Sequence, residues 1–138
     1  FTEPIKPDDT AETLYQKLFS KAAETLLTIL PAWVEGRIKP RKQNHPKATY
    51  TKILKREDGY IDLENPPLPE IFERMIRAYH PWPGVWSKFK VKSEKFKIVK
   101  FLPEREIQPE GRKPMSIRDF LNGYPETKSW IVNLYGPI

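Results

Sequence analysis

The stretch VWSKFKVKSEKFKIVKFL (85–102) decides the fold, because its side chains alternate in character along most of its length. From Lys88 to the pair Ser93-Glu94, lysines alternate with apolar residues, and a similar alternation follows the pair. A period of two on both sides of a two-residue turn predicts a β-hairpin with a lysine face and a core face. The predicted lysine face carries Lys88, Lys90, Lys92, Lys95 and Lys97, and the predicted core face carries Phe89, Val91, Phe96 and Ile98.

The sequence before this hairpin predicts two short strands and a helix. TYTKIL (49–54) and YIDL (60–63) are strand candidates on either side of the turn residues Glu57-Asp58-Gly59. Residues 69–79 place apolar side chains at helical spacing, with a proline in the first turn, where it is tolerated. The proline-rich segment HPWPG (80–84) is expected to end that helix.

The sequence after the hairpin predicts one more helix and one more strand. Residues 117–122 follow Ser116, a good N-terminal cap, and precede Gly123, a typical stop. Residues 130–135 (WIVNLY) predict a final strand. Several short strands with one inserted helix indicate an open OB-like β-barrel over residues 50–138. The predicted fold class is therefore mainly β with helices (α+β).

Residues 9–35 predict a long amphipathic helix. Asp9 is a good N-cap and Glu12 stands three residues later, as in a capping box. Pro31 is expected to end or kink the helix, and Gly36 suits its C-terminal cap. The apolar stripe includes Leu14, Leu18, Leu26 and Leu30. Because this stripe is wide for a lone surface helix, residues 1–36 are expected to pack against a larger body.

Basic charge is concentrated in two stretches of a chain whose overall net charge is +6. Residues 37–56 hold eight lysines and arginines and no acid, and residues 86–101 hold six lysines and one glutamate. Residues 37–49 (RIKPRKQNHPKAT) have no periodicity and predict a basic linker. Such concentrations favour polyanions, either nucleic acid or an anionic membrane surface. No apolar run approaches the roughly 18–20 residues needed to span a membrane.

Residues that commonly carry catalysis or bind metals are scarce. The chain has no cysteine, and its two histidines, His45 and His80, each precede a proline. Glu104, Glu106 and Glu110 lie in a proline-bounded loop with no partner base. The sequence therefore predicts no catalytic residue and no metal site in this chain.

Four segments resemble the C-terminal part of methionyl-tRNA formyltransferases, in that family's order. Two of them, IRAYHPWPGVW (76–86) and IQPEGRKPMSIRDFLNGY (107–124), resemble motifs of the C-terminal domain. ATYTKILKREDGYID (48–62) is similar to the strand through which the chain enters that domain. DTAETLYQKLFSKAAETLLTILPAWVEG (9–36) is similar to the last helix of the catalytic domain. Together they cover nearly the whole chain.

The resemblance implies a part of a cytoplasmic enzyme of translation initiation. The family transfers a formyl group from formyltetrahydrofolate to the amino group of initiator methionyl-tRNA. Its catalytic Asn, His and Asp lie in an N-terminal Rossmann-like domain, and none of them can be matched here. The chain alone is therefore expected to be inactive, to bind no cofactor or metal, and to have tRNA and that catalytic domain as partners.

Within this family, the basic residues are expected to bind the phosphates of tRNA without reading its sequence. The predicted tRNA-binding residues are Arg37, Lys39, Arg41, Lys42, Lys52, Lys88, Lys90, Lys92, Lys95 and Lys97. The aromatic side chains of the hairpin, Phe89, Phe96 and Phe101, are expected in the core rather than against bases. Trp82 and Trp86 are expected to fasten the end of the helix at 69–79 onto the barrel.

Three alternatives remain open at this point. The lysine hairpin is also typical of a solvated strand face, since lysines protect exposed sheet edges. The chain could be a stand-alone nucleic-acid-binding barrel, although the wide stripe of the first helix argues against it. It could also be the tail of a sugar-nucleotide or folate-linked formyltransferase, which does not need a basic surface of this size.

Overall fold

The computed structural model describes residues 1–91 and 95–137. Over these ranges it contains four α-helices and one four-stranded antiparallel sheet. The helices are α1 (Ala11–Val34), α2 (Pro69–Tyr79), α3 (Ile117–Gly123) and α4 (Lys128–Tyr135). The strands are β1 (Val85–Lys90), β2 (Phe96–Phe101), β3 (Glu106–Pro109) and β4 (Met115–Ser116), adjacent in that order. The chain therefore has the predicted α+β class, with an open, barrel-like sheet.

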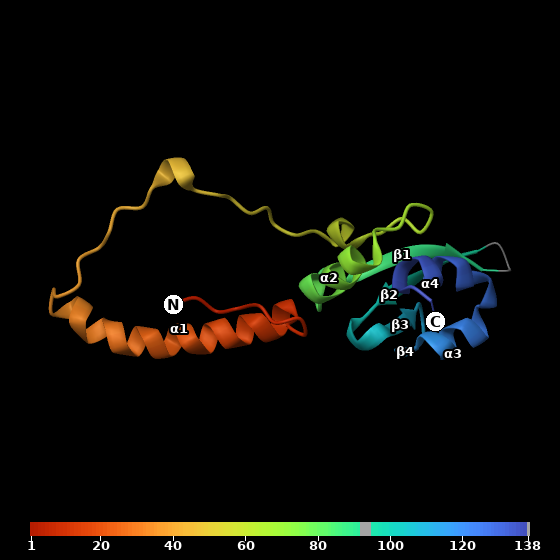
Figure 1. Ribbon diagram of the computed structural model, residues 1–138, viewed down its shortest axis with the longest axis horizontal. Coiled ribbons are helices and arrows are strands. Elements are labelled where there is room, and N and C mark those ends of the chain that lie inside the picture. The colour runs from red at the N-terminus through yellow and green to blue at the C-terminus, as the bar shows by residue number, and fades with distance from the viewer. Residues whose placement is uncertain (92–94, 138) are drawn as a thin grey trace.

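The long helix α1 extends away from the compact part of the molecule, and residues 37–55 return to that part as irregular chain (Figure 1). The first turns of α1 lie against the compact part, where Glu12 Oε2 is 4.0 Å from His80 Nε2. No residue of α1 is buried, and Leu18, Leu26 and Leu30 are all exposed. Among the described residues, no helix combines the length and apolar character that crossing a bilayer requires.

The core lies on one face of the sheet, where α2 and α4 pack. Phe101 of β2 meets Phe72 of α2 edge to face, with ring centroids 5.1 Å apart. Phe89 of β1 meets Tyr124, just after α3, in the same way at 5.2 Å. Such pairs add specific geometry to the burial of large apolar side chains, each of which stabilises the fold by about 1.5–3 kcal/mol. The core also contains Ile76, Val85, Val99, Ile107, Phe120, Ile131 and Leu134.

The helix predictions at 9–35, 69–79 and 117–122 are confirmed, whereas the predicted strand at 130–135 is wrong. That segment is the helix α4. The segment is rich in strand-forming residues, but its buried side chains are Ile131, Leu134 and Tyr135. Leu134 and Tyr135 follow Ile131 by three and four residues. Such spacing places them on one helical face, and the core that this face meets outweighs their preference for strands.

The two predicted strands before α2 are also absent. Residues 49–54 form no strand, and Tyr50 and Ile53 are 90% and 89% exposed. At 60–63 only Tyr60 pairs with the sheet, through a single parallel bridge to Trp86. Strand-forming residues need a neighbouring strand to satisfy their backbone, and none adjoins 49–54 among the described residues. The sheet is completed by β3 and β4, which the sequence did not predict.

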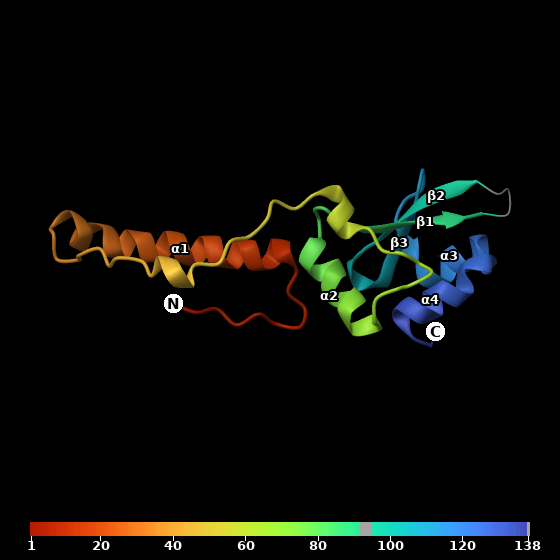
Figure 2. The ribbon, with the colours of Figure 1, turned by 90° about the horizontal axis from the view of Figure 1, so that it is seen from above.

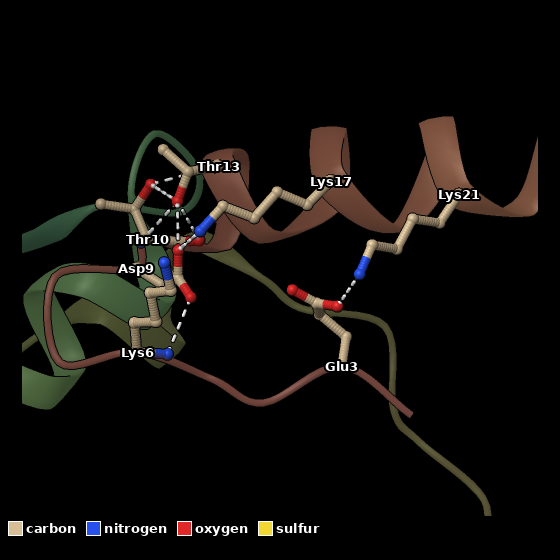
Figure 3. Close-up of polar contacts among 7 residues, drawn as sticks. All are labelled: Glu3, Lys6, Asp9, Thr10, Thr13, Lys17 and Lys21. Atoms are coloured by element: carbon tan, nitrogen blue, oxygen red, sulfur yellow. Dashed lines mark hydrogen bonds and ion pairs between the residues drawn. The ribbon is translucent and has the colours of Figure 1, made fainter. Parts of the chain in front are cut away.

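The N-terminal cap of α1 differs from the prediction by one residue. Thr10 is the N-cap and forms a capping box with Thr13, whose backbone N–H donates to Thr10 Oγ1 at 3.2 Å. Asp9 instead accepts from the Lys6 backbone N–H at 2.8 Å and forms an ion pair with Lys17 (Figure 3). At the other end α1 continues through Pro31 to Val34, and Gly36 adopts φ +72° just beyond the C-cap. The glycine expectation is confirmed, and of the two expectations for Pro31, an end or a kink, the end is wrong.

The Asp9 cluster generates a pH prediction. The Lys17 ammonium and the Lys6 N–H lower the pKa of Asp9 below its ordinary value of 3.8. A lowered folded-state pKa contributes stability above pH 3.8, which is lost as the pH falls through the lower folded value. We expect Asp9→Asn to destabilise α1 at neutral pH but to match the parent chain in strong acid. Thermal melts followed by far-UV circular dichroism test this, and a difference that persists in strong acid would contradict it.

Segment 56–61 is attached to the sheet by one backbone and one side-chain hydrogen bond and by the close packing of two glycines. The Ile61 N–H donates to the Trp86 carbonyl at 3.0 Å, and the buried Ser87 hydroxyl donates to the Ile61 carbonyl at 2.7 Å. Gly59 is buried so closely against Gly84 that a Cβ on Gly59 would lie 1.8 Å from the Gly84 carbonyl oxygen. Only glycine therefore fits at position 59.

We expect Gly59→Ala to destabilise the protein by about 2–3 kcal/mol, because the methyl group must push two backbone segments apart. The matched control is Gly123→Ala at the end of α3, where a Cβ would meet nothing within 4 Å. That change should be neutral or slightly stabilising. Urea unfolding of both variants measures the difference, and equal midpoints would show that the Gly59–Gly84 approach is not a constraint.

Candidate nucleic-acid interface

The pairing of β1 with β2 determines which lysines share a face. Lys88 lies opposite Ile98, Phe89 opposite Lys97, and Lys90 opposite Phe96. The predicted two-residue turn would instead have placed Lys90 opposite Lys97. The turn itself, Ser93-Glu94, lies outside the described residues, but the pairing on either side of it is one residue out of step with the prediction. A shift of one residue moves every side chain of a strand to the other face.

The predicted face of five lysines is therefore wrong. Lys97 lies on the core side of the sheet beside Phe89, with its Nζ 3.5 Å from the Tyr124 hydroxyl. Lys95 lies opposite Val91, whose N–H donates to the Lys95 carbonyl at 3.0 Å, and Lys92 lies outside the described residues. Lys100 takes the place of these lysines on the face of Lys88.

The face of the sheet turned away from the core is called here the outer sheet face. It consists of Trp86, Lys88 and Lys90 of β1, Phe96, Ile98 and Lys100 of β2, and Gln108 of β3. All three lysines are exposed. Phe96 is 67% exposed, so its predicted place in the core is wrong. The shift of the register by one residue turns it to the outer sheet face. Phe89 and Phe101 are buried as predicted.

Arg56 adds a fourth cation to the outer sheet face. Its guanidinium carbon lies 4.9 Å from the centre of the Trp86 ring, and the Trp86 Nε1–H donates to the Arg56 carbonyl at 2.9 Å. The Tyr60 ring meets Trp86 from the side at 5.0 Å. Trp86 thus fastens segment 56–60, rather than the end of α2, to the sheet. Trp82 is 61% exposed, so the predicted fastening role is wrong for it.

The outer sheet face is hollowed next to Trp86. A cavity of about 500 Å³ is lined by residues that include Arg56, Trp82, Trp86, Lys100 and Gln108. A smaller cavity of about 230 Å³ shares Arg56, Lys100 and Gln108 and reaches Ile98. The larger cavity also touches Ile76 and His80, so it extends from the outer sheet face to the end of α2. Cationic and aromatic side chains line its part on the outer sheet face.

The predicted basic residues of the linker do not join this face. Segment 37–49 leaves the end of α1 that is remote from the sheet and arcs away from the helix on its way back toward the compact part (Figure 1 and Figure 2). Arg37 pairs with Glu35 at the end of α1. Lys52 pairs with Asp58, and their hydrogen bond raises the pKa of Lys52 and lowers that of Asp58. Lys39, Arg41 and Lys42 are exposed on the linker.

Sequence reasoning missed Arg56, Lys100 and Gln108 as members of this face. The first two lie within the basic stretches, and a correct hairpin register would have placed Lys100 beside Lys88. Gln108 carries no signal before β3 is known. Within residues 1–91 and 95–137, no three His, Cys, Asp or Glu side chains are grouped so that they could hold a metal ion.

Comparison with known proteins identifies the relatives of this chain. A methionyl-tRNA formyltransferase of Roseiflexus castenholzii is 45% identical over 87 residues, which are 63% of this chain and 27% of the relative. One of Koribacter versatilis is 35% identical over 147 residues, covering 88% of this chain and 46% of the relative. The chain belongs to the methionyl-tRNA formyltransferase family and corresponds to the C-terminal portion of that enzyme. The predicted resemblance is confirmed.

A third relative supports the same family. The methionyl-tRNA formyltransferase of Roseiflexus sp. strain RS-1 is 31% identical over 150 residues, covering 88% of this chain and 46% of the relative. No family model matches the chain. The chain spans about a quarter to a half of the length of these curated relatives. Neither the stand-alone barrel nor the sugar-nucleotide or folate-linked formyltransferase is favoured by these matches.

Proposed function

We propose that this chain is the tRNA-binding portion of an enzyme that formylates the amino group of initiator methionyl-tRNA. The observation that carries the proposal is the gathering of Lys88, Lys90 and Lys100, with Arg56 beside them, on one exposed face of the sheet. Cations gathered on one face build up positive potential, and their mutual repulsion costs free energy in the free protein. A polyanion that covers the face removes this cost, and the names of the relatives favour tRNA as that polyanion.

Contacts of this kind supply affinity without sequence readout. Each lysine acts as a point charge on a phosphate and releases condensed counterions when it binds. Phosphate contacts set the position of a nucleic acid and carry no direct information on its bases. The outer sheet face would therefore grip the body of the tRNA and leave the choice of the acceptor end to another part of the enzyme.

The division of labour along the chain is part of this proposal. Residues 1–36 would end the catalytic domain, residues 37–49 would act as a basic linker, and residues 50–138 would form the tRNA-binding domain. Linker residues Arg37, Lys39, Arg41 and Lys42 would add phosphate contacts once tRNA draws the linker toward it, with Lys52 at its junction with the compact part. Formyltetrahydrofolate would bind the catalytic domain, and the whole enzyme would act in the cytoplasm.

The double change Lys88→Gln and Lys100→Gln tests the outer sheet face. We expect it to weaken the binding of all tRNAs alike, because both side chains would bind phosphates. The slope of log affinity against log salt should become shallower by about one unit for each phosphate that is no longer neutralised. Titration of labelled tRNA at several salt concentrations, followed by fluorescence anisotropy, measures both effects.

A matched control distinguishes local phosphate binding from general charge attraction. Lys128 is exposed at the start of α4, which packs on the core face of the sheet. Lys128→Gln removes the same kind of charge from the opposite side and should leave the salt slope nearly unchanged. Equal effects of changing Lys88, Lys100 or Lys128 alone would refute the outer sheet face as the binding surface.

We also expect the chain of 138 residues to have no formyl-transfer activity by itself. Its two histidines precede prolines, and no segment of the sequence matches the family's catalytic Asn, His and Asp. Incubation with methionyl-tRNA and formyltetrahydrofolate should yield no formylmethionyl-tRNA above a buffer control. Turnover that co-purifies with the chain would place catalytic residues within it and overturn this expectation.

A further inference from the structure

We propose that the hollow lined by Trp82 and Trp86 receives one unpaired RNA base, while the lysines of the outer sheet face hold the adjoining phosphates. This inference rests on the proposed function, because it assigns a second kind of contact to the same RNA ligand. It adds what phosphate contacts alone cannot provide, a preference for a nucleotide that is free to leave its stack.

The walls of the hollow have the chemistry that a base requires. The Trp82 side chain is 61% exposed although it lines a cavity, which leaves most of its apolar surface in contact with water. The Arg56 guanidinium lies over the Trp86 ring and Tyr60 meets the ring edge to face, so the ring and the guanidinium together form a fixed platform. Aromatic rings and arginine guanidinium planes are the usual surfaces on which proteins stack unpaired bases.

The size and margin of the hollow also fit a nucleotide. Its volume of about 500 Å³ lies within the range of about 300–1,000 Å³ that is typical of small-molecule pockets. Gln108 supplies an amide at its edge, and its Nε2 donates to the Arg112 carbonyl at 3.1 Å, which orients the side chain. Arg56 and Lys100 border the same space and carry the positive charge that a phosphate on the same nucleotide would neutralise.

The hollow is continuous with the lysine-bearing part of the outer sheet face. Lys100 borders the hollow and is adjacent across the strands to Trp86, while Lys88 lies two residues farther along β1. Phe96 and Lys100 are four positions apart along β2, a distance of about 13 Å at the usual rise per residue. A backbone lying along Lys90, Lys88 and Lys100 would thus lead to the hollow that Trp82 and Trp86 line.

The charged margin favours RNA over a peptide as the occupant. An apolar or proline-rich peptide would bury against Trp82 and Trp86 but would bring no anion to Arg56 and Lys100. A nucleotide satisfies the aromatic walls and the cations together. The known relatives, whose name includes tRNA, make RNA the natural probe.

The test compares two RNA hairpins with the same loop and the same number of phosphates, one whose stem is fully paired and one with a single unpaired nucleotide in its stem. The unpaired nucleotide carries 2-aminopurine, whose fluorescence is quenched by stacking. We expect the chain to prefer the second hairpin by about tenfold, the order of effect that one base stacked on an aromatic side chain provides. Trp82→Leu should abolish the preference and the quenching, and Trp82→Phe should retain most of both.

The outcomes separate this inference from the proposed function. Failure of the unchanged chain to bind either hairpin would refute the proposed function itself. Binding of both hairpins with no preference, or a preference that survives Trp82→Leu, would overturn the base site and leave phosphate binding intact. Because Trp82 is mostly exposed, its variants should keep the melting temperature of the parent chain, which a thermal melt verifies. Lys88 does not line the hollow, so Lys88→Gln should weaken both hairpins and leave their ratio nearly unchanged.

Discussion

The pairing of Phe89 with Lys97 across the hairpin determines the rest of the compact part. It turns Val99 and Phe101 toward α2 and α4, and thereby completes the apolar face that these helices cover. The same alternation turns Ile98 and Lys100 outward, so core and binding face follow from one register. A slip by one residue would bury lysines and expose the core, and the cost of burying charged groups without partners strongly disfavours it.

The outer sheet face depends on a second constraint, the attachment of segment 56–61 across β1. The hydrogen bonds of Ile61 with Trp86 and Ser87 hold this segment alongside β1. Because Gly59 has no side chain, the segment can approach Gly84 closely. Arg56 is thereby carried over the Trp86 ring. The hollow at Trp82 thus has one wall from the sheet and one margin from a segment that is not a strand.

The interactions that stabilise helix α1 differ from those that stabilise the compact part. It is stabilised locally, by the Thr10–Thr13 capping box and by ion pairs that bind Asp9 to Lys17 and Glu3 to Lys21. Its leucines remain largely exposed in this chain, as expected of a helix whose apolar stripe belongs against another body. The basic linker between α1 and the compact part makes no ladder with the sheet over the described residues, so the positions of its cations do not depend on the core.

The sequence by itself determined the helices α1 and α2, the existence of the hairpin, the concentration of basic charge and the family. These follow from local spacing, caps and composition, which a chain carries wherever it folds. Tertiary structure alone decided the hairpin register, the helical state of residues 130–135 and the absence of a strand at 49–54. For the register and for residues 130–135, burial of Phe101, Ile131 and Leu134 in one shared core decided the conformation. Residues 49–54 form no strand because no other strand adjoins them in the part of the chain that the structure describes. The sequence shows which side chains are available for the outer sheet face, but only the register between β1 and β2 brings Trp86, Lys88 and Lys100 together.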